Sequence, residues 1–165
     1  MDLYFMRHAE AEDTAPGRSD AERQLTEKGI RRSREAGTAL RALGVELDLI
    51  LTSPLARALQ TADIVAEIMG TPVEPAAAIA GPLTLSDLRD LLEEHSLPGR
   101  VMLVGHEPDF SALVGELIGG ADVEMKKGAV AGLDCRAIVR GGARLRWLIV
   151  GRQLSLITAG SGAES

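Results

Sequence analysis

The chain has 165 residues, of which 45% are hydrophobic and 25% are charged, the proportions of a soluble globular protein. Only 2% of the residues are aromatic, so we expect a core built from aliphatic side chains and alanine. The formal net charge of -6 disfavours a general affinity for nucleic acid or for an anionic membrane. Any anion that binds must therefore be held by a local cluster of cationic side chains.

The cysteine content and the length of the apolar runs indicate the cellular compartment. Cys135 is the single cysteine, which excludes an intramolecular disulfide and a thiolate metal cluster. The first apolar run reaches Arg7 too early for a signal peptide, and no apolar run is long enough to span a membrane. We therefore expect a cytoplasmic protein. Residues 1–157 are predicted to form one domain, and the tail 158–165 is expected to be disordered.

Strand and helix signals alternate from the start of the chain. The apolar run at 3–6 predicts a first, buried strand, which is followed by a polar stretch. Thr26 is placed to cap a helix that ends at Gly44. A second strand is predicted at 47–51, and its end leads directly into the next helix.

That next helix has the clearest periodicity in the chain. Its apolar side chains step by four and three residues: Leu55, Leu59, Ala62, Ala66 and Met69. We predict that Ser53 caps this helix, that Pro54 fits its first turn, and that Gly70 ends it.

The alternation continues through the second half of the chain. Residues 72–73 open a short strand at most, and Ser86 is placed to cap the helix that follows. A buried strand at 101–104 leads into a helix that carries Phe110 on its apolar face and stops at the glycine pair 119–120.

A hairpin completes the pattern. Segments 129–139 and 144–150 flank the pair Gly141-Gly142, which predicts two antiparallel strands. Strand–helix alternation followed by a hairpin predicts an α/β fold. Its architecture should be a three-layer α/β/α sandwich with a mostly parallel central sheet and an antiparallel edge strand.

Two of the three histidines follow apolar runs directly. His8 comes after the first strand and His106 after the strand at 101–104, and ligands bind at the carboxyl ends of strands in open α/β sheets. Arg7 can share a ligand with His8 only if the chain leaves the strand there, because neighbouring side chains on a strand point to opposite faces. Arg57 falls in the first turn of its helix, where a cation opposes the macrodipole unless an anion is bound. Each residue alone is more often structural, but the combination predicts an anion site.

Four blocks of sequence contain or adjoin these residues. They read Leu-Tyr-Phe-Met-Arg-His-Ala-Glu at 3–10, Gln-Leu-Thr-Glu-Lys-Gly at 24–29, Thr-Ser-Pro-Leu-Ala-Arg-Ala-Leu-Gln-Thr at 52–61 and Val-Gly-His-Glu-Pro at 104–108. In order and spacing they resemble the histidine phosphatase superfamily, and in particular its short SixA-type branch, the phosphohistidine phosphatases. The resemblance extends to about Val150 and implies a phosphoglycerate mutase-like fold.

The resemblance also implies roles for individual residues. His8 would be the nucleophile, forming a phosphohistidine enzyme intermediate that water hydrolyses, with no cofactor and no metal. Arg7 and Arg57 would clamp the phosphoryl oxygens and depress the pKa of His8, which must be neutral to attack. His106 would donate a hydrogen bond to the phosphoryl group. Arg23 resembles an arginine that reaches towards phosphate, although a solvated loop arginine is an equally good interpretation.

Two departures from larger relatives narrow the expected function. Those relatives insert a helical cap over the site, whereas 73–100 have room for one loop and one helix, so we expect no cap and an open site. Many relatives also place a glutamate in this segment as general acid, but 76–82 contain no carboxylate. Phosphohistidine needs no acid from that position, because its second ring nitrogen can carry a proton. The other carboxylates considered for this role, each more readily explained as structural or surface groups, are Glu10, Asp87 and Glu107.

The leading hypothesis is a metal-independent, monomeric phosphatase that acts on phosphohistidine in a phosphorelay or phosphotransfer protein. The alternatives are a small-molecule phosphomonoesterase with the same nucleophile and a phosphate-binding module without catalysis. The presence of both His8 and His106 argues against the module, since a degenerate site would more readily have lost one. Lys126 and Lys127 either help to dock an acidic partner or form ordinary solvated surface.

Overall fold

One sheet organises the computed structural model, which describes residues 1–160. Within that range the strand order is β3-β2-β4-β1-β5-β6. The strands are β1 (Asp2–Arg7), β2 (Leu49–Thr52), β3 (Val73–Pro75), β4 (Arg100–Gly105), β5 (Val130–Cys135) and β6 (Ala143–Ile149). The first four run parallel, β5 pairs antiparallel with β1, and β6 pairs antiparallel with β5. The predicted mostly parallel sheet with an antiparallel edge is confirmed.

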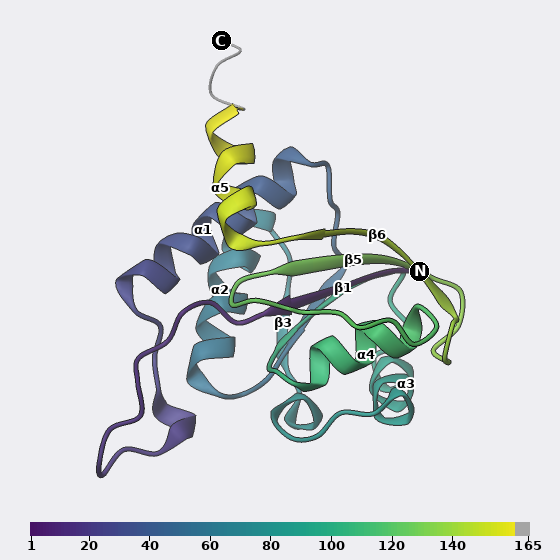
Figure 1. Ribbon diagram of the computed structural model, residues 1–165, viewed down its shortest axis with the longest axis horizontal. Coiled ribbons are helices and arrows are strands. Elements are labelled where there is room, and N and C mark those ends of the chain that lie inside the picture. Colours follow the sequence, from purple (N-terminus) through teal and green to yellow (C-terminus); the bar gives the residue numbers. More distant parts are fainter. Residues whose placement is uncertain (161–165) are drawn as a thin grey trace.

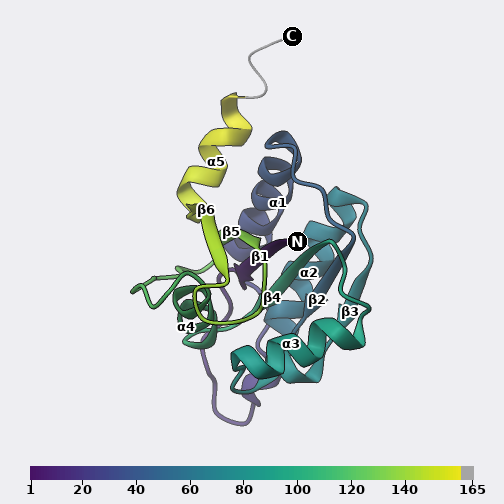
Figure 2. The same cartoon turned by 90° about the vertical axis from the view of Figure 1, so that its right-hand side faces the viewer.

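Helices cover both faces of this sheet, as Figures 1 and 2 show. On one face lie α1 (Glu27–Ala42), α2 (Ala56–Met69) and α5 (Gly151–Gly160), and on the other α3 (Leu85–Glu94) and α4 (Asp109–Leu117). Alternate residues of β1 serve the two cores: Leu3 and Phe5 pack with α3 and α4, whereas Tyr4 and Met6 pack with the opposite layer. The three-layer prediction is therefore also confirmed.

Local capping fixes where α1 and α3 begin. Thr26 caps α1 as predicted, and its hydroxyl accepts a hydrogen bond from the Gly29 amide. The predicted cap of α3 is wrong: Thr84, not Ser86, precedes the first helical residue. Thr84 accepts from the amide of Asp87, whose carboxylate accepts from the Thr84 amide in return, so two otherwise unpaired helix donors are satisfied.

The start of α2 also differs from the prediction. The helix begins at Ala56, so Pro54 lies before it rather than in its first turn, and Leu55 occupies the cap position without a side-chain hydrogen bond. The Ser53 hydroxyl accepts from the Leu55 amide at 3.2 Å and also pairs with His106. The serine thus faces the sheet edge instead of serving as the helix cap. Gly70, with φ 67°, ends the helix as predicted.

Helix α5 was not predicted, and it reaches Gly160, beyond the domain boundary expected at residue 157. Leu154 is buried in the core shared with α1, and the Ser155 hydroxyl donates to Glu35 at 2.6 Å. These contacts hold the segment in a helix, so residues 158–160 are helical rather than part of a disordered tail. The remainder of that predicted tail, 161–165, lies outside the described residues. Across the described part of the chain, the helices are too short or too polar to cross a membrane.

The segment after β3 forms a short turn and one core helix and inserts no helical cap over the carboxyl edge of the sheet, as expected from its length. Residues 77–80 form a short 3-10 turn, and α3 then buries Leu88, Leu91 and Leu92 against a face of the sheet. In Figure 1 this helix lies towards the end of the molecule where β1 begins. It therefore packs as a core helix and does not cover the opposite edge.

Candidate active site

Three neighbouring strands end in register and bring their following residues together. Arg7, the last residue of β1, pairs with Gly105 of β4, so His8 and His106 leave adjacent strands at the same level. The His8 amide donates to the Gly105 carbonyl at 3.0 Å. The Ser53 amide donates to the Val104 carbonyl at 3.0 Å, which places the end of β2 beside them. The structure thus assembles the two predicted histidines at the carboxyl edge of the sheet.

His8 is held in one tautomer. Its ring is buried, with only 6% of the residue exposed, and Nδ1 lies 2.7 Å from the carbonyl oxygen of Ala9. A carbonyl oxygen only accepts, so Nδ1 carries the proton and Nε2 keeps a free lone pair. The Ala9 amide in turn donates to the hydroxyl of buried Thr61 at 3.2 Å. The backbone after β1 therefore orients the imidazole with Nε2 as its basic atom.

The environment keeps His8 neutral. Burial, followed by the nearby charges of His106, Arg57 and Arg7, lowers its pKa from 6.5 to about 4, while the Ala9 hydrogen bond opposes the shift. The predicted direction is confirmed, but burial rather than the arginines is the largest cause. Near neutral pH the ring has the protonation state that a nucleophile needs.

His106 faces His8 across the site, and the ring centroids are 5.3 Å apart. Its Nε2 lies 2.7 Å from the Ser53 hydroxyl, while its buried Nδ1 has no partner among the described residues. An unpaired buried N–H is costlier than an unpaired lone pair, so we place the proton on Nε2. Burial, followed by the charge of Arg57, lowers the pKa of His106 to about 4. His106 thus carries an uncharged Nε2–H at the sheet edge, where it donates to the Ser53 hydroxyl.

Arg7 reaches the same site from the end of β1. One of its terminal nitrogens donates to the Met125 carbonyl at 3.1 Å. Its Nε is buried, and among residues 1–160 no acceptor pairs with it. A buried guanidinium N–H without an acceptor is energetically costly, and a bound anion would remove that cost. The chain leaves the strand directly after Arg7, which meets the condition for Arg7 and His8 to share a ligand.

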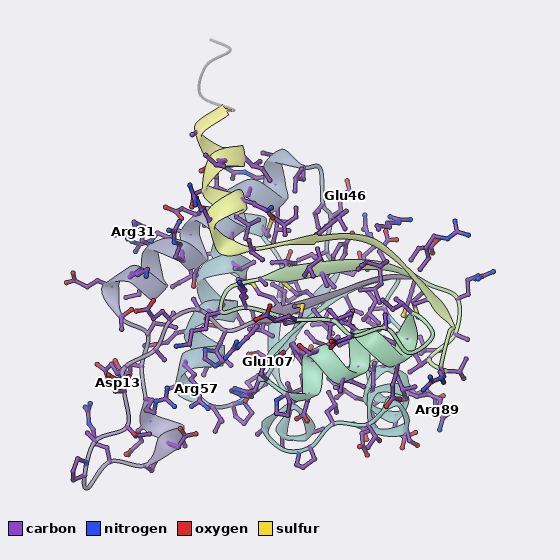
Figure 3. The ribbon with its side chains drawn as sticks, in the orientation of Figure 1. Asp13, Arg31, Glu46, Arg57, Arg89 and Glu107 are labelled. Carbon is purple, nitrogen blue, oxygen red and sulfur yellow. The ribbon has the colours of Figure 1, made fainter. Side chains whose placement is uncertain are left out.

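Arg57 is the second arginine of the site, and its buried guanidinium is paired with a residue that the sequence did not suggest. It lies in the first turn of α2, as predicted, with its side chain 9% exposed. Its terminal nitrogens donate to the Asp20 carbonyl at 2.9 Å and to the Asp20 carboxylate at 3.0 Å. Figure 3 shows Arg57 beside the loop between β1 and α1 that carries Asp20. A carboxylate therefore occupies donors suited to phosphoryl oxygens.

Arg23 and Arg57 bind the two oxygens of the same carboxylate, that of Asp20. Its terminal nitrogen donates to the other oxygen of Asp20 at 2.8 Å, and its Nε donates to the Glu12 carbonyl at 2.7 Å. The hydrogen bond from Arg23, followed by that from Arg57, holds the pKa of Asp20 below its usual range. The structure thus places Arg23 at the rim of the site, bridged to Arg57 through Asp20, rather than in bulk solvent.

The three carboxylates considered as replacements for a general acid all have other partners. Glu10 pairs with Lys28 at 3.1 Å, and Asp87 belongs to the cap of α3. Glu107 accepts from the backbone amide of Ser111 at 3.1 Å within the first turn of α4. These contacts favour the structural interpretation of each. Groups of three or more His, Cys, Asp or Glu side chains arranged to hold a metal are absent from the described residues.

Sequence reasoning missed Asp20, Ser53 and Thr61 as members of this site. Ser53 was interpreted as a helix cap, and Thr61 contributes through a buried backbone contact that no pattern indicates. Asp20 stands three residues before Arg23, a spacing typical of ion pairs in a helical turn, and this was the one available signal.

Comparison with known proteins agrees with this geometry. Residues 3–80 match the model of the histidine phosphatase superfamily (branch 1). An uncharacterized protein of Picosynechococcus sp. is 35% identical over 139 residues, which cover 81% of this chain and 84% of that protein. The 2,3-bisphosphoglycerate-dependent phosphoglycerate mutase of Actinobacillus pleuropneumoniae serotype 5b is 42% identical, but only over 69 residues and 30% of its length. The protein histidine phosphatase SixA, solved with tungstate, superposes with a TM-score of 0.82 at 26% identity over 93% of this chain and 99% of its own. The chain belongs to the histidine phosphatase superfamily, in its SixA-like form.

Proposed function

We propose that this phosphatase removes the phosphoryl group from phosphohistidine on a protein, through a covalent intermediate on His8. The observation that carries the proposal is the state of His8, a neutral buried imidazole whose Nδ1 is committed to Ala9 and whose Nε2 is unprotonated. His106, Arg7 and Arg57 surround the position that a phosphoryl group would take. Similarity to SixA, a protein histidine phosphatase solved with an oxyanion, supports the choice of substrate.

The reaction follows from these atoms. Nε2 of His8 attacks phosphorus, and the N–P bond of the substrate breaks as the new N–P bond forms. The electron pair of the broken bond goes to the departing imidazole, which leaves as a neutral ring because its other nitrogen carries a proton. Arg7, Arg57 and the Nε2–H of His106, which turns from the Ser53 hydroxyl to the phosphoryl group, stabilise the charge on the phosphoryl oxygens. Water then attacks the phosphoenzyme, and inorganic phosphate and neutral His8 are released.

The carboxylates near the site are engaged with other groups and are not placed to donate a proton. The site therefore favours a leaving group that needs no strong acid. Glu10 and Glu107 have structural partners, and the arginines hold Asp20 ionised. An alkoxide must be protonated as it leaves, whereas an imidazole has its own second nitrogen. Phosphoramidates therefore fit this site better than alkyl phosphates do.

Trapping the intermediate tests the nucleophile. After brief mixing with a labelled phosphohistidine protein, the wild type should retain an acid-labile, alkali-stable phosphoryl label, and His8→Ala should retain none. His106→Asn serves as the control, since it keeps the nucleophile but weakens charge stabilisation. Absence of label in the wild type with a competent donor would favour the phosphate-binding module instead.

Substrate comparison tests the leaving group. We expect higher kcat/KM for a phosphohistidine protein than for sugar phosphates, and no loss of turnover after treatment with EDTA. Faster turnover of sugar phosphates would identify the chain as a small-molecule phosphomonoesterase.

A further inference from the structure

A basic groove of about 370 Å³ opens beside the candidate active site. Four separate parts of the chain form it: the residues just after His8, the start of α1, the loop before β5 and the start of α5 with the residue before it. Its charged lining residues are Lys28, Arg32, Lys126, Lys127, Arg152 and Glu10. Five cations and one carboxylate thus meet in a chain whose formal net charge is -6.

Most of this positive charge is uncompensated. Lys28 pairs with Glu10 at 3.1 Å, and Arg32 pairs with Glu35 at 2.9 Å. The three remaining cations, Lys126, Lys127 and Arg152, are exposed, and no carboxylate within the described part of the chain lies within ion-pair distance of them. The first two residues of α5 also line the groove, so the positive end of that helix dipole adds to the field.

The groove is connected to the nucleophile by a single residue. Ala9 lines it, and the carbonyl of Ala9 is the group that holds Nδ1 of His8. On the other side, the Gly128 amide donates to the carbonyls of Arg7 and His8 at 3.2 and 3.1 Å, which ties the lysine-bearing loop to the end of β1. A chain whose phosphoryl group reaches His8 therefore has its neighbouring residues in position to enter the groove.

We propose that this groove docks an acidic polypeptide segment next to the phosphohistidine of the substrate protein. The inference rests on the proposed function and extends it to the partner's surface. Carboxylate side chains in such a segment complement the unpaired cations of the groove. Because they belong to the same polypeptide as the phosphohistidine, they reach the groove when the phosphoryl group reaches His8. Nucleic acid is disfavoured because the positive field is confined to this groove and the molecule as a whole is acidic.

Two synthetic peptides test the proposal. Both contain one histidine phosphorylated with phosphoramidate; one flanks it with glutamates and the other with glutamines. At low salt the wild type should show about tenfold higher kcat/KM for the glutamate peptide, from several exposed ion pairs, and added salt should reduce the preference. The preference is a ratio within one enzyme, so a general loss of activity cancels.

The variant Lys126→Glu/Lys127→Glu should abolish the preference or reverse it. Its matched control is Arg89→Glu/Arg144→Glu, which makes the same change in net charge on exposed residues far from the groove. Arg89 lies at the opposite end of the molecule from Arg57 in Figure 3, and Arg144 aligns through β5 with Asp2 at the start of β1. The control should keep the wild-type preference.

The outcomes separate the two proposals. Equal turnover of both peptides by the wild type would overturn the docking proposal and leave the proposed function standing. Loss of the preference in both double variants would have the same meaning. Competition by a single-stranded oligonucleotide, combined with equal peptide turnover, would assign the groove to nucleic acid. Failure to dephosphorylate either peptide overturns the proposed function, and the docking proposal with it.

Discussion

Asp20 holds the guanidinium of Arg57 from the open side of the site, through its carbonyl at 2.9 Å and its carboxylate at 3.0 Å. The two side chains differ sharply in exposure, at 9% for Arg57 and 55% for Asp20. A buried cation is thus neutralised by a carboxylate that remains accessible to water and lies between β1 and α1 in the chain. A phosphoryl group that binds Arg57 must displace this carboxylate or share the guanidinium with it.

Replacement of Asp20 by asparagine should therefore tighten anion binding. The amide keeps the shape but removes the negative charge that competes for Arg57, so we expect inorganic phosphate to inhibit Asp20→Asn at about tenfold lower concentration. The inhibition constant for phosphate measures the effect. Asp13→Asn is the matched control, because it makes the same charge change at an exposed residue of the same loop, whereas the ion pair with Arg57 is made by Asp20. Weaker phosphate binding in Asp20→Asn would mean that Asp20 orients Arg57 rather than competing for it.

The His8 ring should titrate near pH 4 rather than near 6.5, because burial and the neighbouring arginines disfavour the imidazolium. The chain has three histidines, so two-dimensional NMR of the ring carbons can follow each one. Assignment comes from His8→Gln, whose spectrum lacks that signal. A midpoint above pH 6 would show that the buried ring is easily charged and would remove the argument for a poised nucleophile.

The same shift predicts how stability depends on pH. The folded-state pKa of His8 lies below its unfolded value, so between pH 6.5 and 4 the unfolded chain binds more protons. The free energy of unfolding should therefore fall as the pH drops through this window, with His8 contributing about 3 kcal/mol. Urea denaturation at pH 7 and pH 5 measures the slope, which should be smaller in His8→Gln. Equal slopes in the two proteins would contradict the shift.

The sequence predicted the parts of this site that follow from strand order. His8 and His106 each come directly after a buried run, and parallel strands in register bring such residues together. Arg57 was found because its position near a helix start is unfavourable without an anion. These predictions depend on periodicity and on the geometry of regular elements, which a single sequence displays.

Contacts from irregular segments could not be predicted in the same way. Asp20 lies in a polar loop with no periodicity, and its pairing with Arg57 depends on how that loop folds back. Helix α5 owes its stability to tertiary contacts of Leu154 and Ser155, in a segment that composition alone did not mark as helical. In both cases long-range packing determines the conformation, and local sequence does not report it.

Thr61 should act as a positioning residue for His8. Its buried hydroxyl accepts from the Ala9 amide at 3.2 Å, and the Ala9 carbonyl holds Nδ1 of the nucleophile. Thr61→Val keeps the volume but leaves the amide without an acceptor, which should cost about 1–3 kcal/mol of stability. We also expect kcat to fall by about tenfold with little change in KM, because ring orientation rather than phosphate binding is disturbed. Thr61→Ser, which keeps the hydroxyl, should restore kcat; loss of stability in Thr61→Val with unchanged kcat would assign Thr61 a purely structural role.

Gly29 should resist replacement by alanine, although it lies in α1, where alanine is intrinsically favoured over glycine by about 1 kcal/mol. A Cβ built on Gly29 would lie 2.0 Å from the carbonyl oxygen of Glu10, and that oxygen is already fixed because it accepts from the Thr26 amide at 3.0 Å. The backbone after His8 would have to move, so we expect Gly29→Ala to lose about 2–3 kcal/mol of unfolding free energy despite its better helix propensity. Gly37→Ala in the same helix is the control: its Cβ would meet only the side chain of Ile68, at 3.0 Å, which can shift, so its stability should change by less than about 1 kcal/mol. Urea denaturation measures the free energy of unfolding of both variants. Equal values would show that the backbone at Glu10 moves away from the new Cβ without loss of stability.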